Sequence, residues 1–246
     1  MKIIFSRKGF DSSAGGGPSP IVNGRPISLP IPAGAASATT YGDLGLGDHA
    51  TKASKGRLGA EDHCHHDPMF ICGEGGQKGE CLFGQCGAAQ THLERQNVGL
   101  GDVFVFFGLF ADEHSGEPHH RIFGYLRVEE ICPLAGGAPE DFLALHHPHA
   151  LAMHHKNDVI WRGEGCAATC ASEGLRLTIP GGPPSLWQRP RWLRRGGLSY
   201  HDRADRWIRG SKLKSVARGQ EFVADIGRRG APRDWLSRVI DQIKAS

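Results

Sequence analysis

The sequence predicts a single α+β domain over residues 1–246, built on a mixed or antiparallel sheet or a partly open β-barrel, with a few helices and many loops. Three observations favour this class. Glycine supplies 35 of 246 residues, about twice the usual share of roughly 7%, which indicates many tight turns. Residues 103–110 and 122–128 are rich in the β-branched and aromatic side chains typical of strands. Residues 232–245 have the periodicity of an amphipathic helix.

The first quarter of the chain contains short apolar segments separated by polar ones. Residues 2–6 are expected to form a strand, because Ile3, Ile4 and Phe5 are apolar. Charged residues and the glycines at 15–17 follow, and residues 27–31 are expected to form a further strand. Residues 33–62 are mainly Gly, Ala, Ser and Thr with scattered charge, which predicts a long surface loop.

The middle of the chain carries the strongest strand signals. Residues 86–96 have helical spacing, and residues 103–110 predict a strand buried on both faces. The polar, His-rich residues 111–121 form a hairpin loop in this interpretation, so the strand at 122–128 should pair antiparallel with the first. Residues 159–162 and the alternating residues 175–179 are further expected strands. The terminal helix should bury one face, which contains Trp235, Leu236, Val239, Ile240 and Ile243.

Charge is distributed unevenly along the chain. Residues 181–246 hold 15 basic and 6 acidic side chains, a net charge of +9, whereas the first 180 residues hold 14 and 20, a net charge of −6. This basic part suggests a surface that faces a phosphate-bearing partner, and a solvated Arg-rich surface is the alternative. The sequence contains no apolar run long enough for a membrane span and no secretory signal at its start, so we expect a cytoplasmic protein without a membrane partner.

Histidines and cysteines raise the question of a metal site. The seven cysteines include no C-x-x-C pair, which argues against both a disulfide framework and a compact zinc knuckle. His65 and Asp67 project to one side of an extended segment, which suits a shared metal or a histidine oriented by a carboxylate. A polar turn is the alternative there. The H-x-H at 147–149 could supply two ligands from one side of a strand, or be a solvated loop.

Further polar motifs suggest ligand binding. The first strand leads into Ser6, Arg7, Lys8 and Asp11 and then into the glycines, a composition that could hold a phosphate, although no Walker A or G-x-G-x-x-G motif is present. Glutamine amides could read a base edge. His92 fits a core histidine or a functional one. The interleaved Trp and Arg residues of the basic part, including Trp187 and Trp192, fit a base-stacking surface or a Trp-anchored core.

Several motifs together resemble one protein family. They are residues 1–21, HHDP at 65–68, FGQCGAAQTHL at 83–93, VGLGDVFVFFGLF at 98–110, IFGYLRV at 122–128, HPH at 147–149, LTIPGGPPSLWQRPRWL at 177–193, LSYH at 198–201 and RGQEFV at 218–223. The chain is identified as a member of the nucleotide modification associated domain 3 family of bacteria and phage. The resemblance implies a nucleotide or nucleic-acid context and supplies no reaction.

The polar positions of the family pattern carry over residue by residue. They are Ser6, Arg7, Lys8, Asp11, His65, Asp67, Gln85, Gln90, His92, Asp102, His149, Asn157, His201, Arg218, Gln220 and Glu221. The sequence departs from the pattern at Met69, where a second acidic residue is usual, which weakens a two-carboxylate metal scheme. The strand pair at 103–128 is also similar to strand pairs of PUA and ASCH-like β-barrels, which bind modified bases and RNA.

Our leading hypothesis is therefore an enzyme that acts on a nucleotide or on a base in DNA, as part of a base-modification system. The candidates for acid–base or metal-binding roles are Asp11, His65, Asp67, His149, His201 and Glu221. The candidates for ligand and phosphate binding are Ser6, Arg7, Lys8, Gln85, Gln90, His92, Asn157, Arg218 and Gln220. Any bound metal should be a borderline divalent ion rather than magnesium.

The alternatives are a non-catalytic reader of modified nucleic acid, with Trp187 or Trp192 stacking on a base, and a structural partner in a modification complex. An enzyme predicts that Asp11, His65 and His201 converge in one pocket. A reader predicts an apolar slot lined by aromatic side chains, with few titratable groups.

Overall fold

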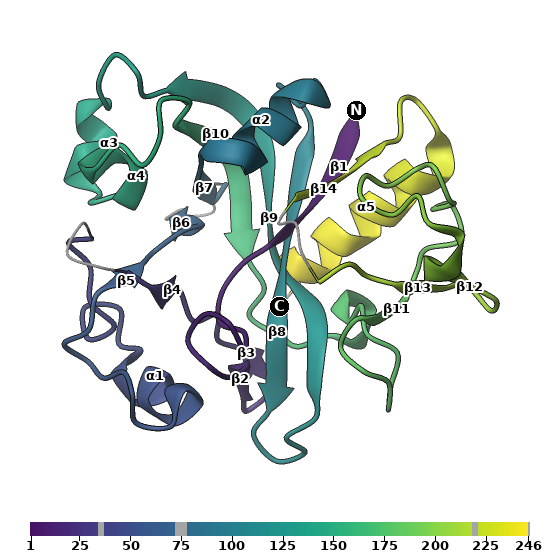
Figure 1. Ribbon diagram of the computed structural model, residues 1–246, viewed down its shortest axis with the longest axis horizontal. Coiled ribbons are helices and arrows are strands. Elements are labelled where there is room, and N and C mark those ends of the chain that lie inside the picture. Colours follow the sequence, from purple (N-terminus) through teal and green to yellow (C-terminus); the bar gives the residue numbers. More distant parts are fainter. Residues whose placement is uncertain (34–36, 72–77, 218–220, 246) are drawn as a thin grey trace.

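One large mixed sheet forms the centre of the molecule (Figure 1). The computed structural model describes residues 1–33, 37–71, 78–217 and 221–245. The strands are β1 (Lys2–Arg7), β2 (Ser19–Val22), β3 (Arg25–Pro26), β4 (Ile31–Pro32), β5 (Cys64–His65), β6 (Met69–Ile71), β7 (Glu80–Gln85), β8 (Val103–Asp112), β9 (Pro118–Pro133), β10 (Val159–Ala167), β11 (Leu186–Gln188), β12 (Trp207–Ile208), β13 (Lys212–Lys214) and β14 (Glu221–Asp225). The helices are α1 (Gly47–Ser54), α2 (Gly87–Arg95), α3 (Glu140–Ala144), α4 (Pro148–Leu151) and α5 (Gly230–Lys244), with 3-10 turns η1 (Glu173–Leu175) and η2 (Ala204–Arg206).

The strand order of the large sheet is β14-β1-β8-β9-β10-β7-β6, and β2 extends it beside the end of β8. The pair β1 and β8 is parallel, whereas β14–β1, β8–β9, β9–β10, β10–β7 and β7–β6 are antiparallel. Within the described residues the two ends of this order do not pair with each other. The sheet is therefore mixed and does not close into a barrel, in agreement with the predicted α+β class.

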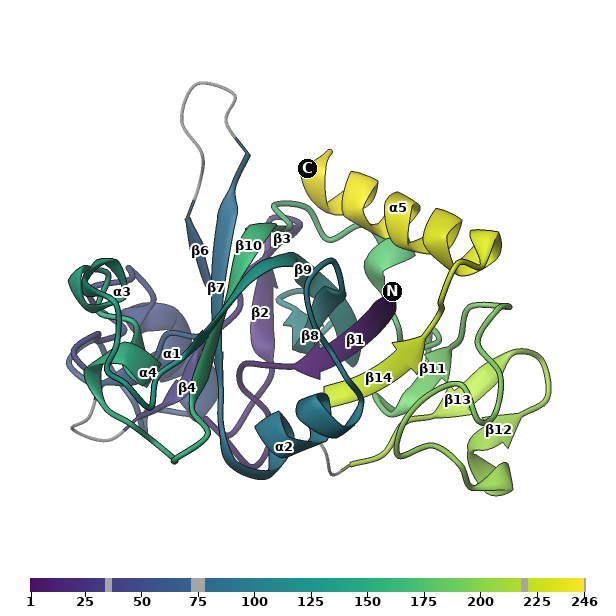
Figure 2. The same cartoon turned by 90° about the horizontal axis from the view of Figure 1, so that it is seen from above.

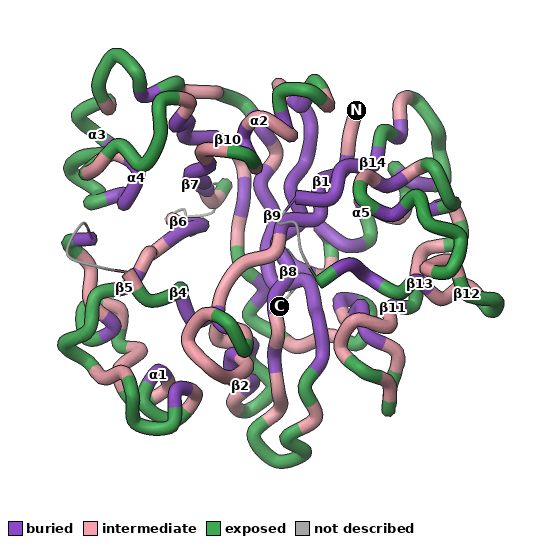
Figure 3. Tube along the Cα trace, viewed as in Figure 1, coloured by how far each residue is buried: buried purple, intermediate pink, exposed green. Residues whose placement is uncertain are grey.

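Alternating side chains of the central strands enter two different cores. On β8, Val103, Val105 and Phe107 pack into one core, and Phe104 and Phe106 pack into the other. Figure 3 shows the central strands as a continuous buried region. This confirms the prediction of a strand buried on both faces, because a period of two sends neighbouring side chains to opposite faces of the sheet. The hairpin of β8 and β9 is antiparallel as predicted, with β9 longer than expected.

The terminal helix α5 covers the first of these cores. Leu236, Val239, Ile240 and Ile243 are buried in it and Trp235 is partly buried, as the periodicity predicts. In Figure 2, α5 and the small sheet β11-β13-β12 lie on the same side of the molecule as β14 and β1. Helix α2 also lies where residues 86–96 predict a helix. In the part of the chain that the structure describes, no helix is both long and apolar enough to cross a bilayer.

Three local predictions are wrong. Residues 33–62 are not simply a surface loop: they contain α1, and Tyr41 and Ala50 are fully buried in a small core with Phe10 and Leu29. Residues 27–31 do not form a strand, since β3 ends before them and β4 begins at their last residue.

Residues 175–179 are the third case. They follow a 3-10 turn and make only isolated bridges, at Arg176 and Thr178, instead of a strand. Leu175 and Leu177 are buried in the core beneath α5. The burial does not follow the alternating pattern beyond Leu177, because Thr178 is buried and Ile179 is only half-buried.

Candidate functional site

A cavity of about 700 Å³ lies where the end of β1, the β4–β5 pair, the end of β7 and α4 meet. Among the described residues, its lining combines charged and polar side chains with Ile, Pro, Ala and Gly, and includes no Phe, Tyr or Trp. The lining residues are Arg7, Lys8, Gly9, Asp11, Ser13, Ala14, Ile31, Pro32, Ala33, Ser37, His65, Asp67, Gly84, Gln85, Cys86, Pro148, His149, His154 and Ala217. We call it the His–Asp cavity.

Asp67 occupies the buried side of this cavity. It lies two residues after the end of β5, and one of its carboxylate oxygens, Oδ1, accepts a hydrogen bond of 2.8 Å from the backbone N–H of Gly84 on β7. The same oxygen lies 3.5 Å from Nε2 of the buried His147. Burial alone would raise the pKa of Asp67, but the contact with His147 and the positive charge of Lys8 outweigh it and hold the pKa below its ordinary value. Asp67 is therefore a fixed, ionised carboxylate.

His149 reaches the cavity from α4, which is not the strand that the H-x-H pattern predicts. Its Nδ1 is hydrogen-bonded to Oδ1 of buried Asp158 at 2.5 Å, and its ring lies directly over Gly84. A Cβ at position 84 would lie 2.1 Å from Cδ2 of this ring, so only glycine permits the approach. A carboxylate that accepts from Nδ1 fixes the imidazole tautomer and leaves Nε2 as an acceptor or metal ligand.

His65 completes this cluster from β5. The centroid of its ring lies 5.1 Å from that of His149 and 5.5 Å from that of His154. Burial lowers the pKa of His65 to about 4, so its ring is neutral at pH 7. His65, Asp67 and His149 each offer one ligand atom, and these atoms lie within 4.8 Å of one another, which is a geometry that could hold a metal ion. The expectation that His65 and Asp67 share one side agrees with this arrangement.

A second polar group, Glu221, lies behind the lining residues Lys8 and Gln85. Glu221 on β14 is buried and is not among the lining residues, but it contacts two that are. Its Oε1 accepts a hydrogen bond of 2.7 Å from Nε2 of Gln85 and lies 3.5 Å from Nζ of Lys8. Burial raises the pKa of Glu221, and the charge of Lys8 opposes this only in part. Glu221 thus positions Lys8 and Gln85, and Ser6 lies opposite it in the β1–β14 register.

The end of β1 and the segment after it line the cavity with Arg7, Lys8, Gly9 and Asp11, whereas Gly15, Gly16 and Gly17 are not among the lining residues. Arg7 donates to the carbonyls of Val216 and Ala217, and burial lowers its pKa. Asp11 caps its own turn by accepting hydrogen bonds from Ser13 and Ala14.

The glycines of this loop pack against the protein itself. Cβ atoms at Gly15, Gly16 and Gly17 would collide with Phe10, with Arg57 and with the carbonyl of Ala53. The backbone here therefore packs closely against the rest of the protein, and phosphate binding by this loop stays a prediction.

Four other candidates lie outside the cavity lining. His201 is fully buried, where Nδ1 contacts the Ser199 carbonyl and Nε2 accepts from the backbone N–H of Val216. Asn157 caps α2 by accepting from the Gly87 N–H at 2.8 Å. His92 contacts the Ser199 hydroxyl and stacks against Tyr200, and the buried Gln90 donates to Glu94.

Asp11 and His65 therefore line one cavity and His201 does not, so the convergence predicted for an enzyme is found only in part. Asp67 and His149 join His65 there in place of His201. Arg218 and Gln220 lie outside the described residues.

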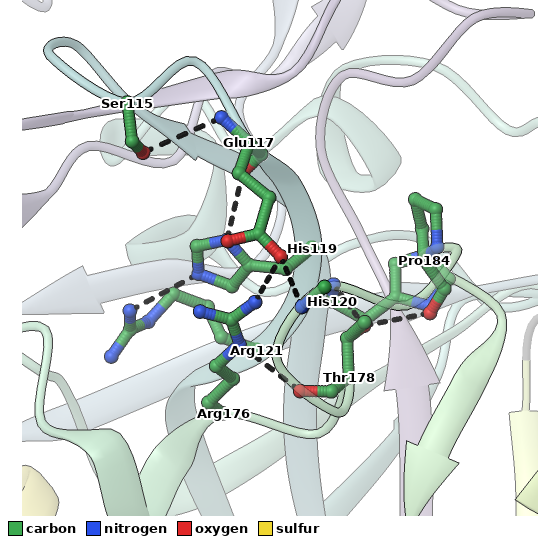
Figure 4. A network of polar contacts seen from close by, with 9 residues as sticks. Ser115, Glu117, His119, His120, Arg121, Arg176, Thr178 and Pro184 are labelled. Atoms are coloured by element: carbon green, nitrogen blue, oxygen red, sulfur yellow. Dashed lines mark hydrogen bonds and ion pairs between the residues drawn. The ribbon is translucent and has the colours of Figure 1, made fainter.

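His119 and His120 belong to a separate polar network (Figure 4). The backbone N–H of His120 donates to Thr178, and Nδ1 of His120 accepts from the indole N–H of Trp187. Trp187 is only 3% exposed, and the ring of Trp192 packs against Trp235. Trp187 is thus a core residue, which contradicts its expected stacking on a base, and Trp192 faces a protein ring.

The sequence did not reveal the roles of Gly84 and Asp158, whereas His147 belongs to the H-x-H at 147–149. Asp158 directly precedes β10, and its link to His149 depends on the packing of α4 against β7, which no local pattern reveals. Gly84 stands inside the FGQ motif at 83–85, and a glycine within a strand is a signal of close approach by another group.

The fold and this site define an α+β protein with a cavity that contains a histidine–carboxylate cluster of His65, Asp67 and His149. The chain belongs to the nucleotide modification associated domain 3 family, whose sequence model matches residues 2–225. The family name associates the chain with nucleotide modification. No curated protein and no solved structure matches the chain.

Proposed function

We propose that this protein is an enzyme that acts on a nucleotide, or on a base within DNA, in the His–Asp cavity. One observation carries the proposal. His65 at the end of β5, Asp67 two residues later and His149 on α4 come together in the cavity, and the chain belongs to a family associated with nucleotide modification. Titratable groups brought together in a cavity, with perturbed pKa values, are typical of catalytic sites.

The lining favours an enzyme over a reader module. A reader needs an aromatic platform for stacking on a base. Among the described residues, no Phe, Tyr or Trp lines the cavity, and Trp187 is buried in the core. In the proposed enzyme, Asp67 and the imidazoles of His65 and His149 would perform acid–base or metal chemistry on the base. Lys8 and Gln85, held by Glu221, would contact the phosphate or the base edge.

The basic residues 181–246 would help to bind DNA. Their net charge of +9 would attract the backbone of DNA toward the molecule. Other components of a base-modification system are proposed as partners, because a family named for association with modification is expected to act beside other enzymes.

Mass spectrometry of nucleosides tests the function. DNA from cells carrying this gene with its neighbouring genes should contain a modified nucleoside that is absent when the gene is deleted. His65→Ala should reduce that nucleoside about 100-fold or more, the usual size of an acid–base contribution. His114→Ala is the matched control, because His114 is exposed in the β8–β9 turn and should leave the level unchanged. A level independent of His65 would contradict the proposed site.

A further inference from the structure

We propose that His65, Asp67 and His149 bind one divalent transition-metal ion in the His–Asp cavity. The inference rests on the proposed function for what the ion would do, but the binding itself can be measured without any substrate. Two imidazoles and one carboxylate are a ligand set that proteins use for zinc and for non-haem iron(II).

The three ligand atoms are already close to metal-binding positions. They lie within 4.8 Å of one another, and two ligands of one tetrahedral ion, each about 2.0–2.2 Å from it, are about 3.3–3.6 Å apart. Rotations of the rings and the carboxylate that shorten these separations by up to about 1.5 Å would therefore bring all three to an ion. Three protein ligands leave coordination positions open for water or substrate, which is the arrangement of catalytic sites rather than structural ones.

A second candidate set shares His149 and can be set aside. It combines His149 with Cys86 and Asp158. Oδ1 of Asp158 lies 2.5 Å from Nδ1 of His149, which is a hydrogen-bond distance and is shorter than the separation of two ligands around one ion. Asp158 is therefore the outer carboxylate that orients a metal-binding histidine, and Nε2 of His149 is the ligand atom.

The other ligands are also held in advance. Asp67 accepts a hydrogen bond from the Gly84 N–H, and the ring of His149 lies over the same glycine, so one residue of β7 sets the distance between the two. The ring of His154 lies 4.6 Å from that of His149 and lines the cavity from its exposed side. His154 could approach the ion as a fourth ligand, but the site does not require it.

Metal titration of untagged protein, stripped with a chelator, tests the proposal. We expect one equivalent of Zn²⁺ to bind, and one equivalent of Co²⁺ to give visible absorption bands from its ligand field. His65→Ala, Asp67→Asn and His149→Ala should each lower the affinity at least 10-fold. Asp158→Asn should keep one equivalent and lower the affinity about 10- to 100-fold, because it acts through His149. His114→Ala should bind as the wild type does.

The outcomes separate this proposal from the proposed function. Circular dichroism melting of each variant confirms that the protein is folded before it is titrated. Absence of stoichiometric binding by wild-type protein, or binding unaffected by all three ligand variants, would overturn the metal site. If the metal site is overturned but cells still contain the modified nucleoside, the proposed enzyme is retained and its metal is not. Stoichiometric, ligand-dependent binding supports the metal site even where no modified nucleoside is found.

Discussion

Replacing Asp67 by asparagine is expected to reduce the modified nucleoside by about 1000-fold, within the range usual for loss of an acid–base group. The side chain keeps its shape and an oxygen that can accept from the Gly84 N–H, so the fold should persist. The negative charge beside His147 and Lys8 is lost, and with it any proton transfer or metal binding at this carboxylate. Mass spectrometry of nucleosides gives the activity, and thermal melting checks the fold.

Asp112→Asn is the matched control for this substitution. Asp112 also accepts two backbone hydrogen bonds, each of 3.0 Å, from the N–H groups of His114 and Ser115. It is the last residue of β8, at the start of the β8–β9 turn. Activity should be unchanged there. If the Asp67 variant modifies DNA as well as the Asp112 variant does, the carboxylate at the centre of the His–Asp cavity has no part in the reaction.

Glu221→Ala is expected to lower the free energy of unfolding by about 3 kcal/mol, because it removes one partner of a buried charge pair. Nζ of Lys8 loses the carboxylate 3.5 Å away, and the amide of Gln85 loses its acceptor. Both residues line the cavity, so ligand binding should weaken as well. Urea unfolding at pH 7 measures the stability.

An exposed ion pair provides the comparison. Glu130→Ala removes a carboxylate that lies 3.8 Å from Arg162 and is half exposed, and it should cost less than about 1 kcal/mol. The double variant Lys8→Met/Glu221→Ala should be less destabilised than the two single changes added together, because their interaction is lost only once. Equal costs for Glu221→Ala and Glu130→Ala would show that the buried network contributes nothing special.

Strong periodic patterns made the centre of the fold predictable from the sequence. The aromatic strand β8, its hairpin with β9 and the amphipathic helix α5 each bury apolar side chains at a regular spacing, so local pattern and tertiary burial agree. Residues 33–62 were misjudged because their small core is built from few apolar side chains. Tyr41 and Ala50 are buried there among glycines and polar residues that resemble a loop.

The site was only partly predictable for a different reason. His65 and Asp67 are two residues apart in an extended segment, and their common side follows from the strand period. The link from His149 to Asp158 and the approach of its ring to Gly84 are tertiary contacts between α4, the start of β10 and β7. His201 does not join the cavity, since its two ring nitrogens contact the Ser199 carbonyl and the Val216 N–H.

A crystal structure of the protein grown with 2′-deoxynucleoside 5′-monophosphates tests the central claim most directly. We expect a nucleotide in the cavity of about 700 Å³, with its base or sugar against His65, Asp67 and His149 and its phosphate toward Lys8. A nucleotide bound instead on the basic surface of residues 181–246, with the cavity occupied only by water, would contradict the assignment of the His–Asp cavity as the site of nucleotide modification.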